Sequence, residues 1–252
     1  MKNHFLYSYA GNKRQEVEEI EKSINFEGIT TIIEPFCGSS ALSVFLAKKY
    51  PKRFKYILND NDPFLIKLYN LMLDVELFKK FEEDINELCK TIVDKESYYK
   101  LTKNGTFEGE FISNKIYNFK QGMYKLNYIY KPIKFIDCEI VKFLRNNDVE
   151  ILNMDAIDLY EQHYNEEETL IFLDPPYLNS HNDFYSYQRN TNIYEYLYKK
   201  PITDNKNNVV IVLERNWIIE LLFQKFKFIE YGKIYQTNKK KTTHIIIRNK
   251  EK

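Results

Sequence analysis

The segment 170–177, LIFLDPPY, combines a carboxylate with a backbone that cannot form a regular hydrogen-bond ladder. An apolar run ends at Asp174, and neither Pro175 nor Pro176 has a backbone N–H. A residue before proline avoids the helical region, which predicts an extended, stiff loop. Two fixed acceptors, the Asp174 carboxylate and the Pro175 carbonyl, beside the flat ring of Tyr177 suit a planar group that carries an NH₂. For this segment alone, a rigid turn between a strand and a loop is the alternative.

Two other loops contain residue types that suit a nucleoside. The segment 30–40, TTIIEPFCGSS, predicts a buried strand at 30–33 that turns through Gly38 into a helix and offers backbone N–H groups to a ligand. Asp60 ends the next apolar strand, where α/β nucleotide-binding proteins place an acid against ribose hydroxyls. A plain tight turn and a helix cap before Pro63 are the alternatives. The single glycine in the first loop does not make a GxGxxG pattern, which disfavours a dinucleotide.

The elements around these loops predict an α/β fold. Apolar strand patterns alternate with helical patterns at the start of the chain and return near its end, which indicates a parallel, doubly wound sheet with ligands at the carboxyl ends of its strands. The segment 228–249 predicts a closing hairpin. Between these parts, an amphipathic helix and a polar, aromatic stretch indicate a mostly helical insert. The expected domains are 1–72 with 148–252, and the insert at 73–147.

Composition excludes several classes of protein. The 252 residues are 44% hydrophobic and 29% charged with a net charge of +1, so a nucleic-acid surface would need local clusters of charge. Cys37, Cys89 and Cys138 form no CxxC pair and the four histidines lack ligand spacing, so neither a disulfide framework nor a metal site is expected. No apolar stretch reaches the ~18 residues of a membrane span, and the N-terminus has no signal-peptide pattern. We expect a cytoplasmic protein without membrane contact.

Segments of the chain resemble, in the same order, the motifs of Dam-type, D12-class adenine-N6 DNA methyltransferases. The resemblance is carried by YAGNK at 9–13, IEPFCGSS at 33–40, ILNDNDPFLIKLYN at 57–70, ILNMDAI at 151–157 and LDPPY at 173–177. In the insert, NKIYNFKQGMYKLN at 114–127 is a looser match. A single motif of this kind is weak evidence, whereas their shared order is specific. The resemblance implies a Rossmann-like, S-adenosylmethionine-dependent methyltransferase domain interrupted by a DNA-recognition domain.

The resemblance also implies a reaction and its catalytic residues. S-adenosylmethionine would be the methyl donor, and the acceptor would be the N6 amino group of an adenine flipped out of a specific DNA sequence. Asp174 and the Pro175 carbonyl would bind the amino group, in a loop stiffened by Pro176. Tyr177 would stack on the extruded base.

Cofactor contacts are implied for the other motifs. Asp60 would bind the ribose, Asp155 would accept from the adenine amino group, and Lys13 would bind the methionine carboxylate. An ordinary surface lysine at position 13 and a helix cap at position 155 are the structural alternatives. The remaining candidates are Tyr9, Ala10, Phe36, Gly38, Ser39 and Ala156; for Phe36, core packing is the alternative.

DNA contacts are expected in the insert, after the catalytic loop, and in the basic stretch 238–244, NKKKTTH. Cations mixed with aromatic side chains suit DNA grooves and base flipping, although a solvated loop would explain 238–244 equally well. The candidates are Lys115, Tyr117, Lys120, Tyr124, Lys125, Asn127, Tyr185, Tyr187, Arg189 and Lys240. Double-stranded DNA is the expected partner and a cognate restriction endonuclease is a candidate partner, while the oligomeric state stays open.

Other functions fit some of the same residues. Methylation of cytosine N4 or of RNA is one, although the acidic first residue of DPPY favours adenine by analogy with the family. A DNA-binding protein that has the fold and little or no turnover is another. Ser40, near the last glycine of the family's loop, and Ala156, in place of an aromatic residue, support that alternative. A nicotinamide oxidoreductase would need the GxGxxG loop that the chain lacks.

Overall fold

The computed structural model describes residues 4–7, 9, 11–115, 134–135, 137–177, 192–200, 206–234 and 241–250. The chain divides into two compact units, which we call the sheet unit and the helical unit. The sheet unit consists of Gly11–Ile66 and Asn147–Lys252, and the helical unit of Met1–Ala10 and Lys67–Asn146. Within the described residues, no helix combines the length and the apolar character needed to cross a membrane.

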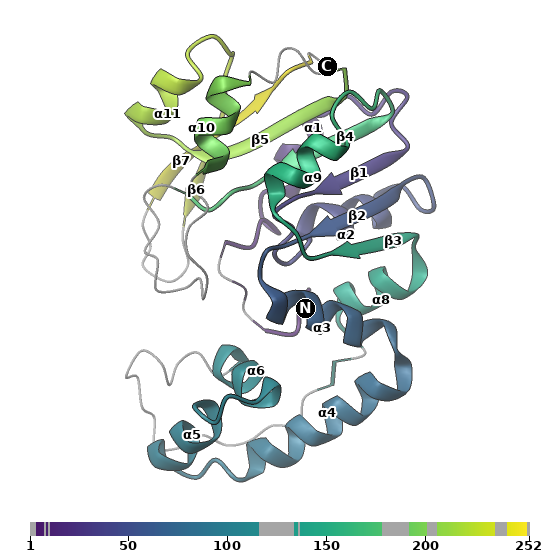
Figure 1. The fold of residues 1–252 in the computed structure, drawn as a ribbon, viewed down its shortest axis with the longest axis vertical. Helices are drawn as coiled ribbons and strands as arrows, with labels where there is room; N and C mark the ends of the chain where they lie inside the picture. Colours follow the sequence, from purple (N-terminus) through teal and green to yellow (C-terminus); the bar gives the residue numbers. More distant parts are fainter. Residues whose placement is uncertain are drawn as a thin grey trace. The chain divides into compact units, whose positions relative to one another are not determined.

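The sheet unit is built on a twisted, mixed sheet (Figure 1). The strands described are β1 Thr31–Glu34, β2 Lys55–Asn59, β3 Val149–Leu152, β4 Thr169–Leu173, β5 Asn208–Glu214, β6 Ile229–Ile234 and β7 Lys241–Arg248. Their order is β3-β2-β1-β4-β5-β7-β6. The first five are parallel, and β7 runs antiparallel to both β5 and β6. The structure therefore confirms the expected Rossmann-like sheet and its closing hairpin.

Helices cover the sheet unit on both faces (Figure 1). Those described are α1 Val17–Lys22, α2 Ala41–Lys49, α9 Ala156–Gln162, α10 Asn192–Lys199 and α11 Trp217–Leu222, while α3 Pro63–Leu73 continues into the helical unit. Ile171 and Leu173 of β4, two residues apart, pack with α9, α10 and α11 in one buried cluster. Leu170 and Phe172 are also buried, and by the alternation of a strand they point to the opposite face. A strand buried on both faces explains the continuous apolar run before Asp174.

The order of strands fixes where a ligand can bind. β1 lies between β2 and β4, so the chain leaves β1 toward one side of the sheet and later continues from β4 toward the other. Such a switch in direction opens a crevice at the carboxyl ends of the two central strands. The loops that follow β1 and β4, which carry Gly38 and Asp174, meet at this edge.

The helical unit has its own aromatic core. Its described helices are α4 Val75–Lys90, α5 Lys95–Thr102, α6 Phe107–Lys115 and α8 Glu139–Asn146, together with the end of α3. Phe81 contacts Phe78, Phe111 and Phe135, with ring centroids 5.1–6.4 Å apart. Asp74 caps α4 by accepting hydrogen bonds from the backbone of Glu76 and Leu77. The unit includes residues 1–10 and 67–72 besides the expected insert, and its assignment to DNA recognition stays a prediction.

Candidate active site

The loop between β1 and α2 is a tight turn fixed at both ends. Gly38 has φ 48° and Ser40 has φ 49°, a left-handed conformation that suits the glycine and costs the serine about 1–2 kcal/mol. The Ser40 N–H donates to the Cys37 carbonyl at 2.7 Å. On the helix side, the Glu34 carboxylate accepts hydrogen bonds from the backbone N–H (3.0 Å) and the hydroxyl of Ser43. These hydrogen bonds fix the turn at the carboxyl end of β1.

Asn59, at the end of β2, connects this strand to the loops after β1 and β3 through hydrogen bonds. Its side chain is fully buried, and its Nδ2 donates to the carbonyls of Pro35 and Met154, both at 3.0 Å. Its Oδ1 accepts from the Met154 N–H at 2.9 Å. The loops after β1 and β3 are therefore fixed to β2. The sequence analysis missed this residue, although a polar side chain inside an apolar strand is a signal that could have found it.

Asp60 follows Asn59 and braces the first loop. Its Oδ2 accepts from the Gly38 N–H and its Oδ1 from the Asp62 N–H, both at 3.0 Å. Burial raises the pKa of Asp60 to about 6, and the two backbone hydrogen bonds oppose that rise. Two of the expected cofactor residues, Gly38 and Asp60, are thus in direct contact, and Asp60 keeps lone pairs for a further donor.

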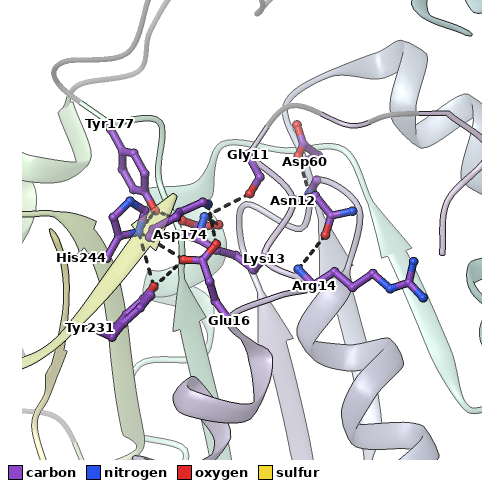
Figure 2. Close-up of polar contacts among 12 residues, drawn as sticks. Gly11, Asn12, Lys13, Arg14, Glu16, Asp60, Asp174, Tyr177, Tyr231 and His244 are labelled. Carbon is purple, nitrogen blue, oxygen red and sulfur yellow. Dashed lines mark hydrogen bonds and ion pairs between the residues drawn. The ribbon is translucent and has the colours of Figure 1, made fainter. Parts of the chain in front are cut away.

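The catalytic candidate Asp174 directly follows β4 and has both carboxylate oxygens engaged (Figure 2). Its Oδ2 forms an ion pair with the Nζ of Lys13, a side chain that is only 5% exposed. The Lys13 Nζ also donates to the Gly11 carbonyl at 3.2 Å and lies 5.0 Å from the centre of the Tyr177 ring. Oδ1 accepts from the Tyr177 hydroxyl at 3.2 Å. The carboxylate is held between a cation and a phenol.

The two prolines after Asp174 are also held in place, as expected for a stiff loop. Pro175 is buried, and the Pro176 carbonyl accepts a hydrogen bond from the hydroxyl of Tyr194, on α10, at 3.0 Å. Sequence reasoning missed Tyr194, since nothing in its own segment distinguishes it from a core tyrosine. Its contact shows that α10 positions the loop that carries Asp174.

Comparison with known proteins finds a family match in the part of the chain that contains the loops after β1 and β2. Residues 9–131 match the model of the D12 class N6 adenine-specific DNA methyltransferase family. The type II methyltransferase M.MjaIII of Methanocaldococcus jannaschii is 27% identical over 216 residues, 72% of each chain. The type II methyltransferase M.CviBI of Paramecium bursaria Chlorella virus NC1A is 23% identical over 97% of this chain and 98% of its own. Residues 9–131 of this chain are thus similar to the D12-class DNA methyltransferases.

Among solved structures, the rRNA methyltransferase aviRa from Streptomyces viridochromogenes has a TM-score of 0.43 with 14% identity, covering 97% of this chain and 89% of that one. The family match ends before β4 and the loop that follows it. The role of the DPPY residues therefore depends on the geometry of Asp174 and on the motif itself.

The structure places most of the other expected cofactor residues at the same edge of the sheet. Asp155 caps α9, because its Oδ1 accepts from the Ile157 N–H at 2.8 Å. Ala156 and Ser39 are buried, and Phe36 packs against the core cluster. The helix cap at Asp155 and the core packing of Phe36 were the structural alternatives, and both are present. Their cofactor roles stay predictions.

Other expected site residues lie elsewhere or outside the described residues. Tyr9 belongs to the helical unit, where its ring packs edge-on against Phe5 with centroids 5.7 Å apart. Lys115 ends α6. Outside the described residues are Ala10, Tyr117, Lys120, Tyr124, Lys125, Asn127, Tyr185, Tyr187, Arg189 and Lys240. The predicted DNA contacts of these residues stay predictions.

The stretch 238–244 was expected to lie in the closing hairpin, with either DNA contact or a solvated loop as its role. In the structure β7 begins at Lys241 and pairs with both β5 and β6, so residues 241–244 are part of a strand and not of a loop. The side chain of His244 is fully buried and so cannot face a DNA phosphate. In β7 the four residues from His244 to Ile247 are buried in succession.

Proposed function

We propose that this enzyme transfers a methyl group from S-adenosylmethionine to the N6 amino group of an adenine that has been flipped out of double-stranded DNA within a specific sequence. The observation that carries the proposal is the Asp174 carboxylate, fixed by Lys13 and Tyr177 at the carboxyl end of β4 beside the β1 loop. The amine of a stacked base cannot reach a site inside the protein, so the base has to leave the duplex.

The loops beside Asp174 fit the cofactor. S-adenosylmethionine, when bound, supplies an electrophilic methyl group on a sulfonium centre. The turn at Gly38 lets a ligand approach the backbone, and Asp60 has lone pairs available for the ribose hydroxyls. Asp155, on the loop that Asn59 fixes through Met154, is the candidate for the cofactor's adenine.

Asp174 acts on the target amine. The lone pair of an adenine N6 is delocalised into the ring, so the nitrogen is a poor nucleophile. Hydrogen bonds from this amine to the Asp174 carboxylate and the Pro175 carbonyl favour a tetrahedral nitrogen. As positive charge grows on that nitrogen, the fixed negative charge of Asp174 stabilises it. The methylated amine then loses one proton, for which Asp174 is the acceptor in contact.

Lys13 and Tyr177 prepare the carboxylate for this role. A carboxylate has about four lone-pair positions, and the two contacts use one on each oxygen. Positions remain for the amine without loss of either contact. The ion pair also offsets the cost of holding a carboxylate in a largely buried site. In this proposal Lys13 serves Asp174 first, and its contact with the cofactor carboxylate is a second role.

Transfer of tritium from labelled S-adenosylmethionine to unmethylated plasmid DNA tests the proposal. Asp174→Asn keeps the size of the side chain and should lower the rate by roughly 10²–10³-fold, the usual cost of losing a preorganised electrostatic group. Asp158→Asn, an exposed position in α9, is the matched control and should retain wild-type transfer.

Digestion of the product to nucleosides identifies the methylated base. N6-methyladenine is the expected product. N4-methylcytosine, label in RNA only, or binding of DNA with no transfer by the wild-type chain would each contradict the proposal. Transfer by Asp174→Asn at the wild-type rate would remove Asp174 from the mechanism.

A further inference from the structure

A buried polar cluster lies next to the hydroxyl group of Tyr177 (Figure 2). It contains Glu16, which precedes α1, Tyr231 and Lys233 of β6, and His244 of β7. His244 is fully buried and Glu16 is 4% exposed. The His244 Nδ1 lies 3.2 Å from Glu16 Oε2 and 3.4 Å from the hydroxyl oxygens of both Tyr177 and Tyr231. The rings of Tyr177 and His244 are perpendicular, with centroids 5.2 Å apart.

The carboxylates of the cluster fix the direction of its hydrogen bonds. An ionised carboxylate only accepts, so the Tyr177 hydroxyl donates to Asp174 and the Tyr231 hydroxyl donates to Glu16 at 2.7 Å. Each phenol oxygen then presents a lone pair toward the His244 Nδ1. That nitrogen faces two phenol lone pairs and the Glu16 carboxylate, so we assign the ring hydrogen to Nδ1. This single N–H is shared between Glu16 Oε2, at 3.2 Å, and the Tyr177 oxygen, at 3.4 Å, while the Tyr177 O–H donates to Asp174.

The charges in the cluster agree with this direction. Burial would raise the pKa of Glu16, but the hydrogen bond with His244 and the charges of Lys13 and Lys233 lower it to about 2. Glu16 is therefore ionised, and its Oε1 forms an ion pair with Lys233. Two ammonium groups, of Lys13 and Lys233, balance the two carboxylates of Glu16 and Asp174.

We propose that His244 and Glu16 are positioning residues for methyl transfer, which orient the Tyr177 hydroxyl, and through it the Asp174 carboxylate, for the target amine. The proposal rests on the proposed function and adds to it residues that touch neither substrate nor cofactor. Glu16 accepts from the His244 Nδ1–H and fixes the ring beside Tyr177, and the same N–H keeps the Tyr177 hydroxyl from turning away from Asp174. Because the Nδ1 of His244 is a donor, this nitrogen is not the base that receives the proton of the reaction.

Two substitutions of similar polarity distinguish this role from simple packing. His244→Asn keeps an N–H near the position of Nδ1, whereas His244→Gln moves its amide to the region of Nε2. We expect the single-turnover rate at saturating cofactor and DNA to fall about 10- to 100-fold in His244→Gln, as for a lost hydrogen bond to a charged system, and to stay within about 3-fold of wild type in His244→Asn. The dissociation constant for S-adenosylmethionine should change by less than about 3-fold in both.

A double-mutant cycle tests whether His244 acts through the Tyr177 hydroxyl. Tyr177→Phe removes the hydroxyl and keeps the ring. If the hydroxyl is the link, the double variant Tyr177→Phe/His244→Gln is no slower than Tyr177→Phe alone. Tyr231→Phe, which loses a hydroxyl on Glu16 and not on Asp174, should reduce the rate less than His244→Gln does. Multiplying losses in the cycle, or equal rates for His244→Gln and His244→Asn, would overturn the proposal.

Crystal structures of the two His244 variants test the positioning independently of activity. We expect the Tyr177 hydroxyl to remain within hydrogen-bond distance of Asp174 in His244→Asn and to leave it in His244→Gln. An unmoved hydroxyl in a well-folded His244→Gln protein would refute the positioning role, whatever the activity. Absence of methyl transfer by the wild-type chain would instead refute the proposed function, and the structures would still decide the role of His244.

Discussion

Asn59→Leu should be among the most destabilising substitutions in the sheet unit. Leucine has a similar volume, but it removes three buried hydrogen bonds, two to the carbonyls of Pro35 and Met154 and one from the Met154 N–H. Each such bond contributes about 1 kcal/mol to the free energy of unfolding. Each buried backbone group that is left without its partner lowers this free energy further. We expect the free energy of unfolding to fall by about 3 kcal/mol or more.

The effect can be measured by urea denaturation and by calorimetry. For a chain of this size, 1 kcal/mol corresponds to about 2–4 °C in the midpoint of thermal unfolding, so Asn59→Leu should lower the midpoint by roughly 6–12 °C. Asn61→Leu, on a neighbouring exposed residue, is the matched control and should change the midpoint little. Because Asn59 fixes the loops that carry Phe36 and Asp155, the affinity for S-adenosylmethionine should also fall. A loss of stability below 1 kcal/mol would refute the role assigned to the three hydrogen bonds.

Three further outcomes are expected. Asp60→Asn should weaken S-adenosylmethionine binding roughly 10- to 100-fold and should change DNA binding little. In the wild type, the affinity for the cofactor should rise as the pH increases through about 6, because the Asp60 carboxylate binds best when it is ionised. Equal losses of affinity for both ligands in calorimetric titrations would argue against the ribose contact. Burial raises the pKa of Glu34 to about 7, so this carboxyl group keeps a proton in the folded protein that it releases near pH 4.5 in the unfolded chain. The free energy of unfolding should therefore decline by up to about 3 kcal/mol between pH 5 and 7. Glu34→Gln should flatten that decline in urea titrations, and an unchanged decline would assign the effect to another group. DNA affinity should fall steeply with salt, with a logarithmic slope near −0.9 per phosphate contact, and a flat dependence in filter-binding assays would exclude a phosphate-dominated interface.

The sequence predicted the parts of the site that local patterns encode. Apolar strands that end in a turn or an acid predicted the strands that precede Gly38, Asp60 and Asp174, and the parallel sheet followed from their alternation with helices. Proline and glycine fix backbone geometry by their own structure, so the stiffness of the DPPY loop and the turn at Gly38 could be expected without a fold.

The residues that the sequence did not predict act through partners far away in the chain. Asn59 bonds to Met154, 95 residues later, and Tyr231 bonds to Glu16, 215 residues earlier. No local pattern contains such pairs, because they form only when the sheet brings β1, β2, β3 and the closing hairpin together. The sequence analysis gave His244 no role of its own, and its burial follows from the pairing of β7 with two neighbours.

The contacts of Asp174 explain why the first residue of this loop should be an acid. An asparagine of the same shape has a single acceptor oxygen, and its NH₂ group would have to face either the Lys13 ammonium or the Tyr177 hydroxyl hydrogen. If this NH₂ group faced Lys13, two hydrogen-bond donors would point at each other in a buried site. If it faced Tyr177, it would break the hydrogen-bond chain that begins at His244. An aspartate satisfies both neighbours and still accepts from the amine of a purine. The requirement for a carboxylate therefore arises from the resting site as well as from the charge that develops during transfer, so Asp174→Asn should impair the enzyme more than Tyr177→Phe or Lys13→Gln does singly.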